Sequence, residues 1–398
     1  MNGKTEHREV PFAHPVLGDE EIAAVSKVLR SGWLTTGGET LAFENEFAEY
    51  VHSPHALAVN SATAGLHLAL EATGTGPGDV VIVPSLTFTA TAEVARYLGA
   101  EVVFADVTEN GLVIDADDVQ RRAAEVTEAG RRLSAIIPVH LAGEVVPMEP
   151  LRRIAERHGA ALIEDAAHAF PSKTAAGFAG TLADVGVYSF YANKTITTGE
   201  GGMVVTSSPT IADRVRTMRL HGIDREAWDR YRKPGSSWQY QVVAPGYKYN
   251  MTDIAAAIGR VQLRKAEQFL TARRAIAARY RTAFSDLDPA GDVVLPIDSP
   301  GHAWHLFIVR LNPDRHDRNA VARALQAAGI GVSVHYTPLH RMEYWSKRYP
   351  AQTTTLPRTD SRFAEILSLP IFPTLTPEQQ DYVVNTVRTV LTTSGAFR

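Results

Sequence analysis

The sequence predicts an α/β protein with a mostly parallel seven-stranded sheet, followed by a smaller C-terminal α+β domain. A chain of 398 residues is long enough for two domains. Over the first two-thirds of the chain, seven short apolar runs alternate with helical patterns, and such alternation is typical of a parallel sheet with both faces covered. Beyond residue 255 the alternation gives way to a long helical pattern and then to mixed elements. We therefore expect a large domain at 1–255 and a linking helix with a small domain at 256–398.

Periodicity justifies the elements of the large domain in order. Apolar residues at three- and four-residue spacing predict helices at 20–31 and 41–50. The seven apolar runs are bounded by Gly, Pro, Asn or Asp, as strands are. The predicted strands are 56–59, 80–83, 102–104, 135–139, 160–163, 185–190 and 203–205. Helical spacing between these strands is clearest at 64–72 and 151–158.

The C-terminal third follows a different pattern. Apolar spacing predicts one long helix from 255 to about 284, and later helices at 318–328 and from 377. Strands are expected at 304–311 and near 332–334, and the polar segment 350–357, which has a proline at each end, predicts a loop.

Composition excludes several classes of protein. The net charge of −4 provides no basic surface for nucleic acid, and no run approaches the roughly 18 apolar residues of a membrane helix. The polar first ten residues lack the apolar core of a secretory signal, so we expect a cytoplasmic protein. The absence of cysteine excludes thiolate chemistry, and no histidine spacing is typical of a metal site.

Three segments carry residues suited to one cofactor. At 59–70 a strand ends, and Ser61 and Thr63 stand where a helix begins, which favours either a phosphate site or an ordinary N-cap. At 160–169 an apolar strand delivers Glu164 and Asp165 to its end, with His168 three residues beyond Asp165. A buried carboxylate needs a cationic partner, which a protonated pyridine nitrogen would provide, although a cap, a metal ligand or a ribose contact fits equally.

The third segment contains one of only eight lysines in the chain. Lys194 follows a strand and is flanked by hydroxyl residues and then by a glycine cluster at 199–202. A lysine in a semi-buried pocket has a lowered pKa and forms Schiff bases, whereas a solvated loop lysine does not. Together, a phosphate site, a pyridinium partner and this lysine are what pyridoxal 5′-phosphate (PLP) requires of an aminotransferase.

Nearly the whole chain resembles the DegT/DnrJ/EryC1/StrS family of PLP-dependent nucleotide-sugar aminotransferases, and several motifs are most similar to the branch that aminates C4 of 4-keto sugars. The motifs lie at 31–37, 61–70, 84–88, 164–169, 189–202, 245–253, 303–307, 335–340 and 369–373. The resemblance implies fold type I, the aspartate aminotransferase architecture. The segment 170–173 departs from the expected glycine-containing pattern, and His168 stands where some relatives have Gln.

The resemblance also implies roles for individual residues. Lys194 would bind the cofactor covalently and shuttle a proton, while Asp165 would pair with the pyridine nitrogen. The other cofactor-binding residues would be Thr63, Ala64, Phe88, His168, Ser189 and Asn250. Asn250 would reach the phosphate of a neighbouring subunit, which predicts a homodimer with shared active sites. Candidates for the substrate end are Thr35, Lys248, His335 and Tyr336.

The expected reaction is transamination of a TDP-linked 4-keto-6-deoxyhexose at C4, with L-glutamate as donor, for an amino sugar of a natural product such as an antibiotic. The alternatives are a UDP-linked 4-keto pentose or hexose for cell-envelope glycans, amination at C3, or a non-catalytic PLP-binding regulator.

Two other sequence patterns have simpler interpretations. The glycines at 74–78 precede a strand and predict a turn, not a dinucleotide site. The basic stretch 213–233 suits a sugar-nucleotide diphosphate less well than a solvated helix and loop.

Overall fold

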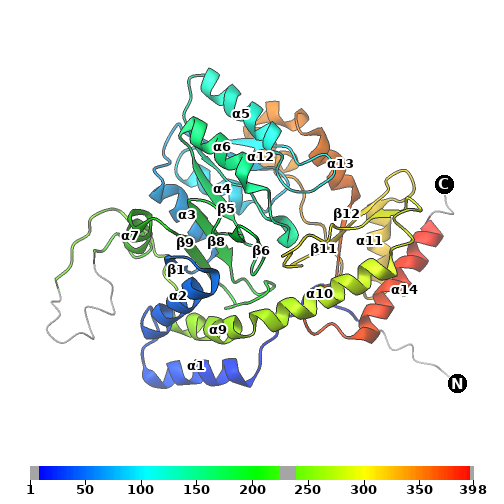
Figure 1. Ribbon diagram of the computed structural model, residues 1–398, viewed down its shortest axis with the longest axis horizontal. Helices are drawn as coiled ribbons and strands as arrows, with labels where there is room; N and C mark the ends of the chain where they lie inside the picture. The colour runs from blue at the N-terminus through cyan, green and yellow to red at the C-terminus, as the bar shows by residue number, and fades with distance from the viewer. Residues whose placement is uncertain (1–8, 225–238, 395–398) are drawn as a thin grey trace.

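A computed structural model describes residues 9–224 and 239–394 (Figure 1). At its centre is a seven-stranded sheet in the order β1-β9-β8-β5-β4-β2-β3. The strands are β1 (His55–Val59), β2 (Val80–Pro84), β3 (Glu101–Ala105), β4 (Leu133–Ile136), β5 (Ala161–Asp165), β8 (Val185–Ser189) and β9 (Gly202–Thr206). β9 is antiparallel to both of its neighbours, and the other four pairs are parallel. The mostly parallel seven-stranded sheet that the sequence predicts is confirmed.

Helices cover both faces of this sheet, because alternate residues of a buried strand point to opposite sides. On one face, Val185 and Val187 of β8 pack in a core with α3 (Ala62–Ala72), α4 (Ala90–Tyr97) and α7 (Pro209–Met218). The opposite face packs against α2 (Gly38–Val51), α5 (Ala116–Glu128), α6 (Met148–His158) and α9 (Asp253–Arg264). The N-terminal helix α1 (Asp19–Ser31) lies against α9.

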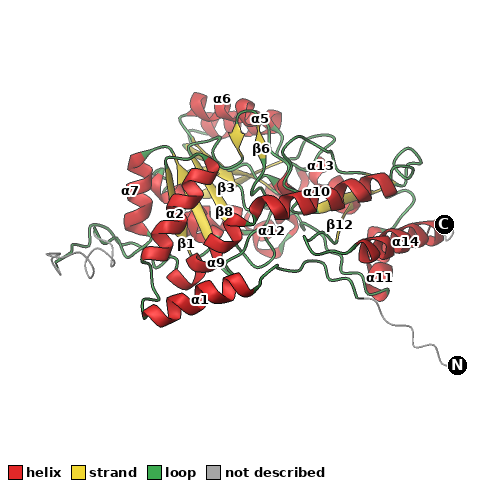
Figure 2. Ribbon diagram, turned by 60° about the horizontal axis from the view of Figure 1, so that its bottom comes forward, coloured by secondary structure: helices red, strands yellow, loops and turns green. Residues whose placement is uncertain are grey.

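The C-terminal part has a separate apolar core around a three-stranded antiparallel sheet of β10 (Val293–Val294), β11 (Phe307–Leu311) and β12 (Ile366–Leu369). The helices α10 (Ala266–Ala283), α11 (Arg318–Ala327) and α14 (Pro377–Ser394) enclose it, at the end of the molecule opposite α7 (Figure 2). Val10 belongs to this core and donates its backbone N–H to Gly329, so the N-terminal segment crosses to the small sheet.

Smaller elements connect the two parts. They are the hairpin β6 (Lys173–Thr174) and β7 (Gly177–Phe178), the helices α12 (Glu343–Arg348) and α13 (Pro357–Glu365), and short 3-10 turns at Leu141–Gly143, Leu339–Arg341 and Pro350–Thr354. The glycine segment 74–78 is a turn between α3 and β2, as expected.

Three expectations for the C-terminal third are wrong. The long helix at 255–284 is interrupted at Lys265, where α9 ends and α10 begins. Instead of a strand at 332–334 there is one bridge, between Ser333 and Ser368. The segment 350–357 is not an open loop, because Pro350 begins a 3-10 helix and Pro357 begins α13. Proline fits the first turn of a helix, where its missing N–H costs nothing, so these prolines start helices.

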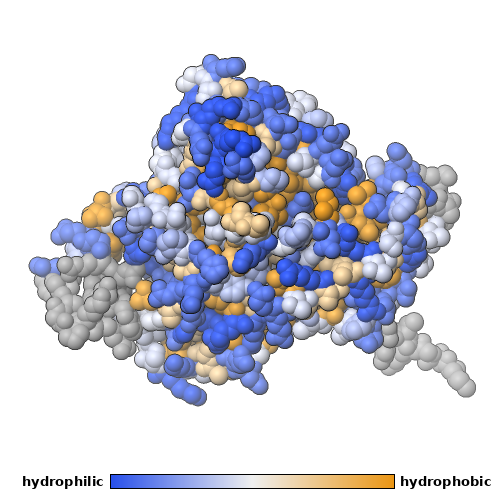
Figure 3. All heavy atoms as spheres, in the orientation of Figure 1, coloured by the Kyte–Doolittle hydropathy of each residue, from blue (hydrophilic) through white to orange (hydrophobic). Residues whose placement is uncertain are grey.

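Hydrophilic side chains cover most of the face drawn in Figure 3, with apolar residues in smaller patches between them. Within residues 9–224 and 239–394, no helix is both long and apolar enough to cross a bilayer.

Candidate active site

A cavity of about 470 Å³ opens at the carboxyl ends of β5 and β8, beside the first turn of α3. In α/β sheets this edge is where ligands bind. Eight of the predicted residues line the cavity: Thr63, Phe88, Asp165, His168, Ser189, Lys194, His335 and Tyr336. They come from strand ends, the start of α3 and loops, which the fold brings together although Thr63 and Tyr336 are 273 positions apart in the sequence.

The two carboxylates at the end of β5 point to opposite faces of the sheet. Asp165 lines the cavity, where its carboxylate accepts hydrogen bonds from the Thr91 hydroxyl (2.7 Å) and the Ala167 N–H (3.1 Å). Glu164 is fully buried on the other side and accepts from the Gly180 N–H at 2.7 Å and from His140 Nε2 at 2.8 Å. Strand alternation therefore assigns the cavity to Asp165 alone.

Burial raises the pKa of Asp165, although its two hydrogen bonds and the charge of Lys194 oppose the shift. A carboxylate in this position is stabilised by a cation placed against it. The protonated ring nitrogen of PLP is such a cation.

Lys194 stands on the loop after β8 and lines the same cavity. Burial lowers the pKa of its ammonium group to about 8, and the charge of Asp165 limits the shift. A substantial fraction of the amine is therefore neutral slightly above neutral pH, which is the form that attacks a carbonyl carbon.

The first turn of α3 forms another wall of the cavity. Ser61, the N-cap, accepts a hydrogen bond from the Ala64 N–H at 3.1 Å, and Ser61, Ala62 and Thr63 line the cavity. Ala64 is buried and does not line the cavity, and its N–H is already used by Ser61. The N-cap interpretation of Ser61 is confirmed, and the hydroxyls of Ser61 and Thr63 at the start of the helix are available to an anion.

His168 is held in one tautomer by its neighbours. The Ala142 N–H donates to His168 Nδ1 at 3.4 Å, so the ring proton is assigned to Nε2, which lies 3.0 Å from the Tyr336 hydroxyl. Burial lowers the pKa of His168 well below its usual range. The imidazole is therefore neutral. Burial also raises the pKa of Tyr336, which keeps its phenol protonated.

His335 also lines the cavity, and its Nδ1 is 2.8 Å from the Ser368 hydroxyl. Burial lowers its pKa to about 4, and the nearby charge of Lys194 adds to the shift. Phe88 is more than half exposed, and its ring centroid lies 5.9 Å from that of Tyr336. Its ring thus lies at the open side of the cavity.

Three predicted residues lie elsewhere on the chain. Asn250 donates to the Thr36 hydroxyl at 2.7 Å and accepts from Lys248 Nζ at 2.7 Å, so these residues form a cluster of their own. Thr35 is exposed next to this cluster. None of the three lines the cavity of the same chain, whose lining includes only residues up to 201 and then His335 and Tyr336.

Sequence reasoning missed several neighbours of the cavity. Thr91 binds Asp165 from α4, and Asn193 has a buried side-chain oxygen without a hydrogen-bond partner among the described residues. His305 packs its ring 4.4 Å from that of His168. Thr91 comes to the site on α4 and His305 on the segment before β11, and no local pattern signals them.

The basic stretch at 213–233 offers no free cations in its described part. Arg214 pairs with Glu71, Arg216 with Asp213 and Arg219 with Glu44. Positions 225–233 lie outside the described residues.

A second arrangement resembles a Ser-His-Asp triad. Ser85 Oγ lies 2.7 Å from His340 Nδ1, and His340 Nε2 lies 2.9 Å from Asp360. Ser85 is fully buried and also accepts the His340 N–H. It is inaccessible to a substrate, so the network fastens the chain after Tyr336 to the end of β2.

The residues of the larger cavity fit PLP. One space of suitable size is surrounded by a lysine with a lowered pKa, a buried carboxylate and a helix N-terminus with hydroxyl groups. Asn193, whose side-chain oxygen has no hydrogen-bond partner among the described residues, also lines this space. Fold and site together define a PLP-dependent aminotransferase.

Comparison with known proteins gives the family. The model of the DegT/DnrJ/EryC1/StrS aminotransferase family matches residues 15–388, and the chain belongs to this family. It is a sugar aminotransferase, a transferase whose cofactor is PLP.

Relatives of this chain include proteins of known structure. The spore coat polysaccharide biosynthesis protein SpsC of Bacillus subtilis is 39% identical over 387 residues, which cover 96% of this chain and 97% of SpsC. The putative sugar aminotransferase Spr1654 of Streptococcus pneumoniae, solved in its PMP form, is 31% identical with a TM-score of 0.88 and coverage of 97% and 100%. DesI, solved with its TDP-sugar product, is 29% identical with a TM-score of 0.84 and coverage of 97% and 94%.

Proposed function

We propose that this enzyme aminates C4 of a TDP-linked 4-keto-6-deoxyhexose, with L-glutamate as the amino donor. The observation that carries the proposal is the presence of Lys194 and Asp165 in one cavity that Phe88, His335 and Tyr336 also line. A sugar ring needs such a mixture of aromatic faces and polar groups. The structure of DesI with its TDP-sugar product supports a TDP-linked substrate.

In the proposed reaction the chain's residues have distinct tasks. The bound cofactor supplies an electron sink and carries the amino group between the two substrates. Asp165 balances the charge of its protonated ring nitrogen, and the first turn of α3 with Ser189 holds its phosphate. Lys194 Nζ removes a proton from the donor carbon and later returns one to C4 of the sugar. Neutral His168, fixed by Ala142, donates a hydrogen bond from Nε2 and cannot compete for these protons.

We further propose that the active site is shared between two subunits of a homodimer in the cytoplasm. In the cluster of Thr35, Thr36, Lys248 and Asn250, Thr35 and Lys248 are exposed, and Thr36 and Asn250 are buried next to them, apart from the cavity of their own chain. A second copy related by two-fold symmetry would receive these groups at its own cavity. Asn250 and Lys248 would then contact phosphate groups across the interface.

A second candidate has one observation in its favour. SpsC is named for spore coat polysaccharide biosynthesis, which points to a cell-envelope glycan instead of an antibiotic sugar. The substrate would then be a UDP- or TDP-linked keto sugar of that pathway. Amination at C3 is the remaining alternative for the same site.

The test uses the pyridoxamine form of the enzyme, prepared with excess L-glutamate and freed of it. We expect a TDP-4-keto-6-deoxyhexose to restore the aldehyde absorbance fastest among TDP- and UDP-linked 3-keto and 4-keto sugars. Faster recovery with a UDP-linked or 3-keto sugar would replace the substrate assignment. The failure of glutamate to convert the cofactor at all would indicate a non-catalytic regulator. Lys194→Ala should lose the lysine-bound absorbance and all turnover.

A further inference from the structure

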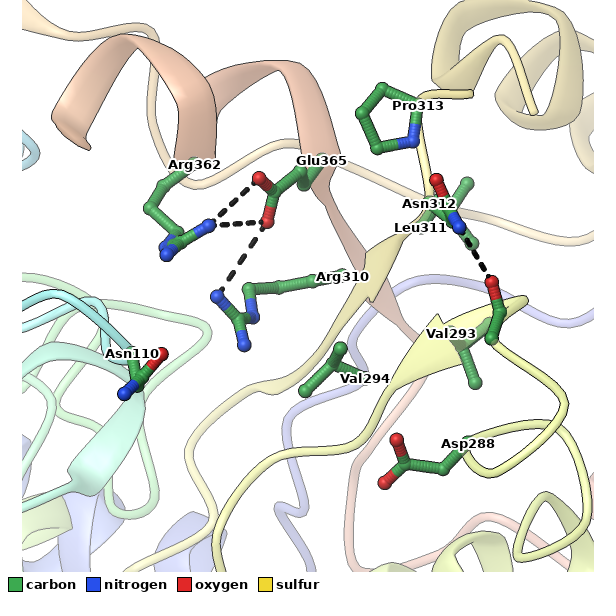
Figure 4. Close-up of a pocket in the computed structure, with 11 residues that line it drawn as sticks. Asn110, Asp288, Val293, Val294, Arg310, Leu311, Asn312, Pro313, Arg362 and Glu365 are labelled. Carbon is green, nitrogen blue, oxygen red and sulfur yellow. Dashed lines mark hydrogen bonds and ion pairs between the residues drawn. The ribbon is translucent and has the colours of Figure 1, made fainter. Parts of the chain in front are cut away.

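A second cavity, of about 340 Å³, lies between the small sheet and the large domain (Figure 4). Its walls come from β10, β11 and α13, and from the loop after β3 that carries Asn110. It shares no lining residue with the cavity that contains Lys194. An occupant of this space would contact both parts of the molecule.

Two arginines and one glutamate dominate the polar wall. Arg362 donates to both oxygens of Glu365, at 2.8 and 2.9 Å, and Ser361 donates to the same carboxylate at 2.8 Å. Arg310 extends from β11 toward Asn110, with its nearest carboxylate oxygen, on Glu365, at 3.6 Å (Figure 4). The other terminal nitrogen of Arg362 donates to the Glu109 carbonyl, so both terminal nitrogens of Arg362 are used, and the Glu365 carboxylate is used by Arg362 and Ser361.

Arg310 has no acceptor within hydrogen-bond distance among the described residues, although its side chain is only 13% exposed. Arg362 likewise has a buried Nε without a partner in the described part of the chain. Desolvated donors without acceptors are costly, and charged ones most of all. The other acid in the lining, Asp288, is exposed and makes no ion pair with either arginine within 4 Å, although its charge acts on Arg310. The lining thus holds two arginines and two acids, and the guanidinium group of Arg310 makes no hydrogen bond to the described residues.

We propose that this cavity binds a small organic phosphate. A phosphomonoester carries close to two negative charges and three acceptor oxygens, which match the unused guanidinium donors of Arg310, with the charge of Arg362 next to them. Next to the arginines, Val293, Val294 and Leu311 form an apolar surface for a compact organic body. The loop that carries Asn110 belongs to the large domain, and the other walls belong to the C-terminal part. A bound phosphate ester would therefore contact both and hold that loop against the small sheet.

The test is calorimetric titration of the cofactor-loaded enzyme with glucose 1-phosphate and with thymidine 5′-monophosphate. We expect saturable binding of at least one of them that Arg310→Met weakens at least about tenfold, the loss expected for one charge-assisted contact. Arg323→Met, at an exposed arginine of the neighbouring α11, is the matched control and should bind as the wild type does. Binding that survives Arg310→Met belongs to another site and overturns the proposal, as does the absence of binding.

A second pair of variants avoids changes to the buried wall. Val294 is 41% exposed and lines the cavity, so Val294→Glu places a negative charge there and should also weaken binding at least about tenfold. Ile297→Glu, at a 60% exposed position outside the lining, should have no effect. Equal effects of the two substitutions would contradict the site. Succinate that binds as tightly as the phosphate esters would overturn the assignment to phosphate.

Discussion

At the residue scale, Glu164 and Asp165 are adjacent in β5 but have different surroundings. Glu164 is fully buried, with three hydrogen-bond donors from His140, Gly180 and Leu182. Asp165 faces the cavity with two donors. The first arrangement is that of a structural anion, whose own donors satisfy it. The second leaves capacity for a cationic ligand.

This difference predicts opposite effects of matched substitutions. Asp165→Asn should lower kcat at least about 100-fold, because an amide cannot balance a protonated ring nitrogen, yet change the free energy of unfolding little. Glu164→Gln should cost about 2 kcal/mol of stability, since one of its donors loses its acceptor, with kcat of the folded fraction nearly unchanged. Urea unfolding and turnover of both variants check this. Similar losses of activity in both would show that the two carboxylates are not separated in function.

The Lys194 ammonium group makes the cofactor-free protein less stable at low pH. Its pKa is about 8 in the folded protein, below its ordinary value near 10.5, so the folded state binds fewer protons between these values. Below pH 8 the burial cost is fully present, and it disappears as the pH rises toward 10.5. We expect cofactor-free Lys194→Met to be more stable than the wild type by about 2 kcal/mol at pH 7.

Urea unfolding of both proteins at pH 7 and pH 10 measures this difference. The advantage of the methionine variant should shrink strongly at pH 10, because most of the wild-type lysine is then neutral in the folded state. Lys347→Met, at an exposed surface pair with Glu343, should show no such pH dependence. A constant advantage at both pH values would mean that burial does not perturb the lysine.

At the element scale, the start of α3 is set by its contact with β9. Gly202 begins β9, and a Cβ there would lie 2.8 Å from the backbone of Ser61 and Ala62. Backbone atoms cannot move aside as a side chain can. The absence of a side chain at 202 thus allows the helix N-terminus to sit against the strand, next to the cavity.

Gly202→Ala should therefore push the first turn of α3 out of place. We expect at least about tenfold weaker cofactor binding and a loss of roughly 1–3 kcal/mol in stability. Gly76→Ala is the matched control, because a Cβ at 76 meets nothing within 4 Å and its backbone is not left-handed. Cofactor titration by absorbance or fluorescence, with thermal unfolding, tests both variants. Unchanged affinity in Gly202→Ala would separate this contact from the phosphate site.

At the scale of the whole molecule, the polar cluster around Asn250 lies apart from its own cavity. If two subunits share each site, the Lys194→Ala and Asn250→Ala substitutions of a hybrid dimer both fall in the same site. One site then keeps both intact residues. After unfolding and refolding an equimolar mixture of the two inactive variants, we expect about one quarter of wild-type activity, since half of the dimers are hybrids with one intact site.

Mixing Lys194→Ala with Asp165→Asn is the control for this complementation. Both residues line the same cavity of one chain, so every hybrid site remains damaged and activity should not return. Recovery in the control mixture, or none in the first, would contradict the shared site.

Patterns along the chain were enough to predict the sheet, the PLP cofactor, and Lys194 and Asp165 as the pair of residues expected to act on it. Apolar runs bounded by turn residues mark strands because burial on both faces removes polar positions, and Lys194 and Asp165 follow such runs directly. Local signals were weaker in the C-terminal third. The break at Lys265 occurs within an unbroken apolar pattern, and Pro350 and Pro357 suit a loop as well as the start of a helix.

Which side chains meet depends on the folded chain. Folding gave Asp165 and Glu164 different surroundings, brought Thr91 and His305 to the site, and placed Arg310 beside Arg362 in a second cavity. Thr91 and His305 lie on segments far from Asp165 and His168 in the sequence, as Arg310 does from Arg362, and their distances depend on how these elements pack together. The sequence pattern indicates which face of a helix or strand a residue lies on, but the packing of the elements decides which other side chains it contacts.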